Sequence, residues 1–176
     1  MKPLILGILL LATAGIAHAI PTREEALAAI ATLEKNLMSD AALDAARTIT
    51  EFAKDSDEVV FTLSPDLIPW VVDERPENEG DETINSLLLA VYLAGNAKSQ
   101  LASGKTEDDP YSGWVEVLKA YRRLQARHPI RIPSLDKFSE MEAKGTLEQH
   151  ARELKAGEER SQHPTDPAAR RRDASF

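Results

Sequence analysis

The chain contains no cysteine. Disulfide bonds are therefore excluded, and the fold must be stabilised by packing alone. Catalysis by a thiol and metal sites built from thiolates are excluded for the same reason. The sequence also lacks a Gly-rich phosphate loop, a G-x-S-x-G turn and an H-E-x-x-H helix. These are motifs of nucleotide-binding proteins, serine hydrolases and zinc proteases.

Histidine is scarce, and beyond residue 19 it occurs only as His128, His150 and His163. His150 and Glu153 would share a helix face, but zinc sites use about three or four protein ligands. We therefore expect neither a metal site nor a cofactor.

Positive charge is in deficit, because 21 Lys and Arg residues stand against 29 Asp and Glu residues, for a net charge of −8. Lys2 is the only charged residue among the first 19, so their removal would change the net charge to −9. General nucleic-acid binding depends on positive charge. We therefore expect no nucleic-acid partner.

The first 19 residues have the pattern of a secretory signal peptide. Met1-Lys2-Pro3 is a short basic start, residues 4–16 are apolar, and Ala17-His18-Ala19 is an A-x-A cleavage site. The apolar run is shorter than the roughly 20 residues of a membrane-spanning helix, and no later segment resembles a span. We expect export, cleavage after Ala19, and a soluble product in the periplasm or outside the cell.

The rest of the chain has the length of one domain, about 100 to 200 residues, and its apolar residues recur with helical spacing. We predict an all-α domain over residues 20–155, with about six or seven helices packed as antiparallel hairpins. Residues 156–176 include Gly157, two prolines and three consecutive arginines, with almost no apolar side chain. That composition predicts a disordered, charged tail.

Two helices are predicted at the start of the domain. Thr22-Arg23-Glu24-Glu25 has the T-x-x-E form of a capping box and begins a helix that runs to about Met38. Ser39 or Asp40 then caps a second helix. The short connection predicts an antiparallel hairpin.

The most apolar stretch of the domain, residues 83–104, predicts a central helix. Between Leu87 and Leu93 apolar residues cover every side, which is tolerated only in a helix surrounded by protein. From Asn96 to Gln100 polar residues alternate with apolar ones, which predicts that the helix emerges toward solvent. Gly104 then ends it.

A stripe of small residues follows the same helix and consists of Ala90, Ala94 and Ala97. Glycine inside a helix is unfavourable by about 1 kcal/mol relative to alanine, so the neighbouring Gly95 predicts a close helix contact. Pro110 after Asp109 marks the start of the next helix. We expect the small-residue stripe to meet this helix through Trp114, Leu118 and Tyr121.

Two shorter helices are predicted toward the C-terminal end. Ser134 caps one that ends at Gly145. Thr146 begins a T-x-x-Q capping box, which starts a last helix that runs to about Lys155.

Residues 59–63, Val-Val-Phe-Thr-Leu, fit either a short helix capped by Ser56 or a β-strand. We predict a helix, with a short β-hairpin between residues 59–63 and 70–72 as the alternative. Ser64-Pro65-Asp66 then predicts a helical turn, which Pro69 ends.

Residues 73–82 contain six acidic residues and one basic residue, a composition that predicts a surface loop. Clustered carboxylates also suit calcium, but the regular D-x-[DN]-x-[DN]-G spacing is absent. We therefore favour a solvated loop whose charge suits the positive start of the following helix.

Positive charge gathers on the helix predicted from Pro110. The candidate anion-binding or partner-binding residues are Lys119, Arg122, Arg123 and Arg127, with Arg131 just beyond. The alternative is that they form the solvated face of an amphipathic helix.

Ser134-Leu135-Asp136-Lys137 matches S-x-x-K, the serine nucleophile motif of exported penicillin-binding enzymes. The partner motifs S-D-N and K-T-G are absent. Serine after proline at a helix start is also a common cap. We therefore assign no catalytic residue.

The sequence favours an exported, non-catalytic helical protein that binds another macromolecule in the cell envelope or outside the cell. The expected partner is a protein or an acidic envelope component. One alternative is a small exported hydrolase whose carboxylates come from separate helices. The other is anion binding through the basic face of residues 110–127.

Overall fold

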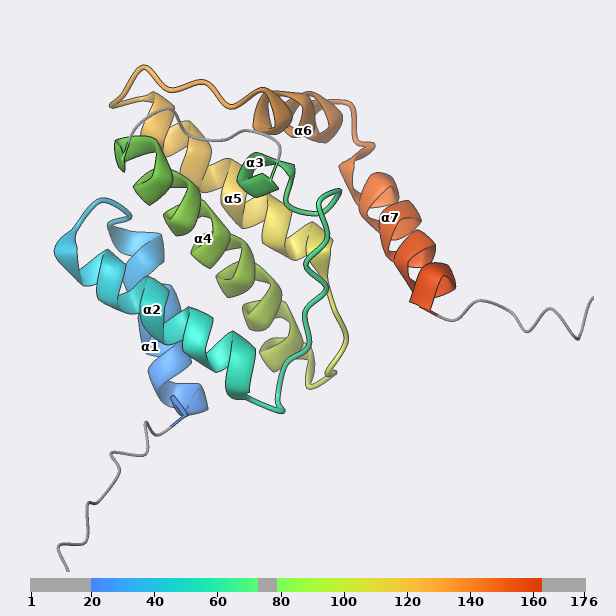
Figure 1. Ribbon diagram of the computed structural model, residues 1–176, viewed down its shortest axis with the longest axis horizontal. Coiled ribbons are helices and arrows are strands. Elements are labelled where there is room, and N and C mark those ends of the chain that lie inside the picture. Colours follow the sequence, from blue (N-terminus) through green and yellow to red (C-terminus); the bar gives the residue numbers. More distant parts are fainter. Residues whose placement is uncertain (1–19, 73–78, 163–176) are drawn as a thin grey trace, which may run out of the picture.

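The computed structural model describes residues 20–72 and 79–162. In this described part the chain forms helices and no β-strand, which confirms the predicted all-α class. Figure 1 shows helix α4 at the centre, with α5 along one side and the α1–α2 hairpin along another. The helices are α1 (Arg23–Lys35), α2 (Asp40–Asp55), α3 (Pro69–Val72), α4 (Glu79–Ser103), α5 (Pro110–Gln125), α6 (Pro133–Ala143) and α7 (Leu147–Gln162).

The first two helices begin where their capping residues predict. The Thr22 hydroxyl oxygen accepts a hydrogen bond from the Glu25 N–H, and the Glu25 carboxylate accepts one from the Thr22 N–H. This reciprocal pair is the predicted capping box. The Ser39 hydroxyl caps α2 by accepting from the N–H of Ala42. Helix α1 ends at Lys35, earlier than the expected Met38.

Helix α4 is the buried centre of the fold. Its residues from Leu87 to Leu93 are buried except for the half-buried Leu89, as the apolar run predicts. The helix starts at Glu79, earlier than expected, so residues 79–82 of the predicted acidic loop are helical. Residues 73–78, the rest of that loop, lie outside the described residues. Gly104, with φ of 66°, follows the helix end as predicted.

Helices α4 and α5 approach closely at two glycines. A Cβ atom on Gly95 would lie 2.7 Å from the carbonyl oxygen of Ser112, and one on Gly113 would lie 2.6 Å from the Tyr92 ring. Neither position has room for a larger side chain. The predicted close contact at Gly95 is therefore confirmed.

The small-residue stripe of Ala90, Ala94 and Ala97 is buried, but it does not face α5. At about 100° per residue, the stripe lies on the opposite side of α4 from the residues that contact α5. That side meets the α1–α2 hairpin, where Arg23 donates a hydrogen bond to the carbonyl oxygen of Leu101. The prediction that this stripe packs against α5 was therefore wrong, because the contact of α4 with α5 is made at Gly95 and not at the alanines.

Residues 59–63 form neither the predicted helix nor the alternative β-hairpin. They are an extended segment that runs from α2 toward α3 along one side of the molecule (Figure 1). Ser64 then starts a turn, with its carbonyl oxygen accepting from the N–H groups of Leu67 and Ile68. Pro69 begins α3 instead of ending this turn, since proline suits the first position of a helix.

The C-terminal helices follow their proline and glycine signals. Asp109 caps α5, and Pro110 is its first residue, as predicted. Helix α6 starts at Pro133 with Ile132 as its cap, so the assignment of Ser134 as the cap was wrong. The helix ends at Ala143, and the predicted terminator Gly145, with φ of 70°, follows directly after the capping residue Lys144.

Helix α7 extends beyond the expected end at Lys155 to Gln162. Residues 156–162 are therefore helical, although the composition predicted a disordered tail from residue 156. The remaining tail residues, 163–176, and the predicted signal peptide, residues 1–19, lie outside the described residues. Among the helices that are described, none has the length and apolar character needed to cross a membrane.

Candidate functional site

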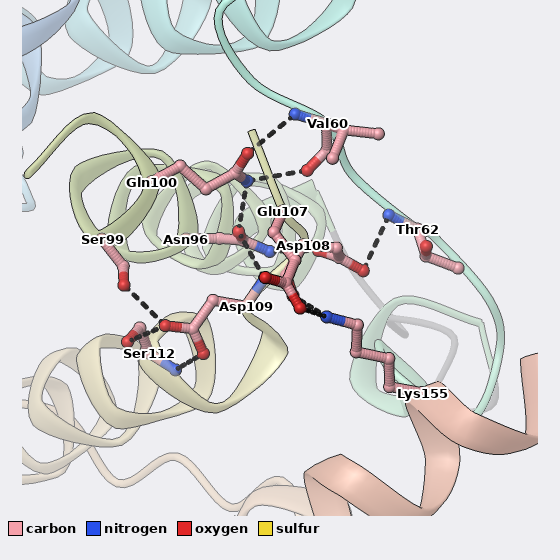
Figure 2. A network of polar contacts seen from close by, with 10 residues as sticks. All are labelled: Val60, Thr62, Asn96, Ser99, Gln100, Glu107, Asp108, Asp109, Ser112 and Lys155. Atoms are coloured by element: carbon pink, nitrogen blue, oxygen red, sulfur yellow. Dashed lines mark hydrogen bonds and ion pairs between the residues drawn. The ribbon is translucent and has the colours of Figure 1, made fainter. Parts of the chain in front are cut away.

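A buried polar network lies where the C-terminal half of α4 faces the start of α5. In the described residues the buried polar side chains are Asn96, Gln100 and Asp108. Buried polar groups require hydrogen-bond partners, and here they bond to one another and to neighbouring backbone (Figure 2). The prediction that α4 emerges toward solvent from Asn96 to Gln100 was therefore wrong for these two amides.

The Gln100 amide holds the extended segment against α4. Its Oε1 accepts from the N–H of Val60 at 2.9 Å, and its Nε2 donates to the Val60 carbonyl oxygen at 2.7 Å. Nε2 also donates to Oδ1 of Asn96 at 2.7 Å. One side chain thus gives Val60 the pair of bonds that a neighbouring β-strand would otherwise provide.

Asp108 bonds to α4 and to the extended segment through different oxygens. Oδ1 accepts from the Asn96 side-chain amide at 2.6 Å, and Oδ2 accepts from the N–H of Thr62 at 3.2 Å. Burial raises the pKa of Asp108, because it disfavours the charged carboxylate, while the bonds from Asn96 and Thr62 oppose the rise. The raised pKa of Asp108 therefore comes from its enclosed position.

Asp109 caps α5 and contacts α4. Its Oδ1 accepts from the N–H of Ser112 at 3.1 Å, and its Oδ2 accepts from the Ser112 and Ser99 hydroxyls, both at 2.6 Å. Burial acts to raise the pKa of Asp109, but the hydrogen bonds from Ser112 and Ser99 outweigh it and lower this pKa. Neighbouring carboxylates thus have pKa values shifted in opposite directions.

A cavity of about 320 Å³ adjoins this network, between the end of α4, the start of α5 and helix α7. Asp108 and Asp109 line it together with three cationic residues, Lys105, Arg152 and Lys155. Lys155 donates to the Glu107 carboxylate at 3.0 Å and to the Asp108 carbonyl oxygen at 2.8 Å. These bonds tie α7 to the loop that precedes α5 (Figure 2).

The carboxylates in this cavity act as hydrogen-bond acceptors for the chain itself. Each oxygen of Asp108 and of Asp109 accepts at least one bond from another residue. The arrangement therefore fixes the loop. The exposed Lys105 is a charged group that the cavity offers to a polar ligand, whereas Arg152 pairs with Glu148 at 3.3 Å. Over the part of the chain that is described, no group of three or more His, Asp or Glu side chains could hold a metal ion.

The predicted basic candidates are spread along α5 and the segment after it. Lys119 pairs with Glu116 on the same helix, and Arg131 pairs with Asp136 of α6 at 3.1 Å. Arg127 is exposed just beyond the end of α5. These contacts do not gather the positive charges into one pocket.

The two central candidates link α5 to other helices. Arg122 forms an ion pair with Glu142 of α6, and Arg123 donates to the carbonyl oxygen of Glu34 in α1. Both arginines therefore have structural contacts, and their role in binding an anion or a partner stays a prediction.

The structure brings the S-x-x-K motif and His150 to one place. Ser134, Lys137 and His150 line a second cavity of about 310 Å³ near α3. The His150 ring stacks on Trp114, with ring centroids 5.6 Å apart, which fits a packing role for the imidazole. The hydroxyl oxygen of Ser134 is buried and is therefore poorly placed to attack a substrate.

The sequence analysis missed these network residues because Asn, Gln and Asp are residue types that usually lie on the surface. Asn96 and Gln100 stand four positions apart and so share a helix face, which is the one local sign of a joint role. Their acceptors and donors come from residues 60–62 and 108–109, which are distant in the sequence.

Compared with protein-family models, with curated proteins and with solved structures, the chain has no match.

Proposed function

We propose that the chain is an exported, non-catalytic protein that binds another macromolecule in the cell envelope or outside the cell. The observation that carries the proposal is the bonding of Asp108 and Asp109, the carboxylates with shifted pKa values in the cavity between α4, α5 and α7. An acid, base or nucleophile must reach a substrate in order to react. These carboxylates instead bond to backbone N–H groups, to hydroxyls and to the Asn96 amide.

Export is supported by the signal-peptide pattern of residues 1–19. The test is mass spectrometry of tagged protein recovered from the envelope and the medium. We expect a chain that begins at Ile20. Recovery of the intact chain from the cytoplasm alone would contradict export.

Binding is tested by crosslinking in cells, purification through the tag, and identification of the crosslinked component. Each candidate is then purified and titrated against the protein by calorimetry. We expect saturable binding of a protein or of an acidic envelope component. If none of the captured components binds in the purified system, the proposed function fails.

A hydrolase is the second candidate, and one observation favours it, although the carboxylates concerned come from one loop and not from separate helices as the sequence predicted. Asp108 and Asp109 line one cavity and have pKa values shifted in opposite directions, a pattern found in acid and base pairs of enzymes. Turnover of ester, glycoside and peptide substrates is measured for the protein and for Asp108→Asn. Turnover that this substitution abolishes in a folded protein would establish the hydrolase, whereas we expect no turnover from either.

A further inference from the structure

The extended segment over residues 59–63 has one edge bonded to the fold, and the bonding begins at Glu58 in the bend before it. The bonds fall on every second residue: the Glu58 carbonyl oxygen accepts from the Thr106 hydroxyl, Val60 pairs with Gln100, and the Thr62 N–H donates to Asp108. In an extended chain the N–H and C=O groups of successive residues point to opposite edges. The alternation therefore marks this segment as a single strand whose neighbours are side chains.

The opposite edge has no hydrogen bonds. Among the described residues, nothing bonds to the backbone N–H and C=O groups of Val59, Phe61 and Leu63. Figure 2 shows the bonded groups of Val60 and Thr62 turned toward α4 and the loop before α5. The groups between them point the other way, in the pattern of an unpaired edge strand. Val59 is only 6% exposed, so Phe61 and Leu63 form the accessible part of this edge.

Some side chains of this segment pack into the core, and others are exposed apolar groups. Val59 is buried, and Phe61 packs against the core. Val60 and Leu63 are 44% and 52% exposed, among the largest exposures of big apolar residues in the described part. Unpaired backbone groups beside exposed apolar side chains are what an extended peptide needs in order to add a strand.

We propose that this edge binds an extended segment of a partner polypeptide by β-strand addition, with apolar partner side chains beside Val60 and Leu63. The exposed carboxylates of Asp57 and Asp66 lie at the two ends of the strand, so the fitting partner segment has basic flanks. The proposal rests on the proposed function and adds the class of partner and its mode of binding.

A second copy of this chain fits the edge less well than a basic segment. Antiparallel pairing of two copies about Phe61 would bring Asp57 of one copy near the Asp66 end of the other. Like charges opposite one another in a strand pair are destabilising. The acidic net charge of −8 adds to this repulsion.

The first test uses a fluorescent peptide of alternating valine and threonine with two lysines at each end. Binding is measured by anisotropy, against the same peptide N-methylated at every valine and threonine. We expect saturable binding of the first peptide and at least about a tenfold loss for the methylated one, because strand addition requires peptide N–H donors. Equal binding of both peptides, or binding of neither, would overturn the proposal.

The second test changes the protein at Leu63, whose side chain is largely exposed. Leu63→Pro and Leu63→Ala both remove the side chain, but only proline also removes the N–H of the free edge. We expect Leu63→Pro to bind the peptide about tenfold more weakly than Leu63→Ala, the effect of roughly one edge hydrogen bond. Circular dichroism verifies the fold of each variant, and the methylated peptide still decides if Leu63→Pro does not fold.

Light scattering tests whether a second copy of this chain, and not a partner peptide, covers the edge. A dimer of the protein that Leu63→Pro dissociates would show that a second copy covers the strand, which overturns the proposal. If a crosslinked partner binds the Leu63→Pro and Leu63→Ala variants equally, this surface is wrong while the proposed function stands. If no macromolecule binds at all, both fail.

Discussion

The side-chain amide of Gln100 pairs with the backbone of Val60 through two hydrogen bonds, of 2.9 and 2.7 Å, across 40 positions of sequence. One glutamine on the central helix therefore determines where the segment after α2 lies. Because Gln100 is only 2% exposed, its amide lies away from water, where an unmade hydrogen bond is most unfavourable.

Replacing Gln100 with leucine should lower the free energy of unfolding by about 3 kcal/mol, because it leaves the N–H and C=O groups of Val60 without partners while keeping similar side-chain volume. Urea unfolding followed by circular dichroism measures the change. Lys105→Ala is the matched control: Lys105 is exposed beside the same network, and such surface changes alter stability by less than about 0.5 kcal/mol. An equally small effect for Gln100→Leu would show that the pairing contributes little.

Asp109 should stabilise the protein in a manner that depends on pH. Its pKa is lowered in the folded protein, so its charge contributes stability above the unfolded aspartate pKa of about 3.9. That contribution is lost as the pH falls through the lower folded-state pKa. We expect Asp109→Ala to be less stable by about 1 to 2 kcal/mol near neutral pH, as for other lost helix caps. The difference in stability should shrink as the pH falls below the unfolded aspartate pKa and through the folded-state pKa of Asp109.

Unfolding by urea at neutral pH and at about pH 3 measures this trend, with the pH chosen below the reference value for aspartate. Asp57→Ala serves as the control, since Asp57 is exposed and makes none of the cap's bonds. A difference between Asp109→Ala and the unchanged protein that stays constant with pH would assign the effect to the neutral cap geometry alone.

Local signals predicted the helices well because helix ends depend on neighbouring residues. The capping box at Thr22, the proline after Asp109 and the glycines Gly104 and Gly145 each act within about one turn of the helix they begin or end. The apolar run from Leu87 to Leu93 likewise predicted burial, since every side of that helix is apolar.

The candidate site could not be predicted in the same way, because its bonds join residues that are far apart in sequence. Residues 59–63 have the composition of a strand or a helix, and the hydrogen bonds that hold them extended come from the distant Gln100 and Asp108. Asparagine is a polar residue, so its hydropathy predicts an exposed position. Asn96 is buried because residues from other segments supply its hydrogen-bond partners. Prediction of this network would have required the tertiary fold.

Gly95 should resist substitution, although alanine is the better helix former. A Cβ at Gly95 would lie 2.7 Å from the backbone oxygen of Ser112 and 2.9 Å from Cγ of Glu116. The backbone oxygen cannot move without separating α4 from α5, so we expect Gly95→Ala to lose about 1 to 3 kcal/mol of stability, as other overpacked cores do.

Gly157 provides the matched control, because a Cβ there would meet no atom within 4 Å and the residue lies inside α7. Gly157→Ala should stabilise the protein by up to about 1 kcal/mol, the difference in helix propensity. Thermal unfolding of both variants measures the contrast. If both substitutions stabilise the protein, the close approach of α4 and α5 at Gly95 is wrong.

The last prediction separates the two interpretations of the basic residues on α5. Arg122 pairs with Glu142, with side chains 49% and 30% exposed, so a double-mutant cycle between them should yield less than about 1 kcal/mol of coupling because solvent screens the pair.

If these contacts are structural, the triple variant Arg122→Ala, Arg123→Ala, Arg127→Ala is slightly less stable, and its sedimentation with acidic vesicles at low salt is unchanged. If the face binds anions, the variant loses attachment, and salt weakens attachment of the unchanged protein. Arg127→Ala alone should then reduce attachment more than Arg122→Ala, because the Arg122 charge is already paired. We expect the structural outcome, since acidic or carbonyl groups of α6 and α1 already accept hydrogen bonds from Arg122 and Arg123.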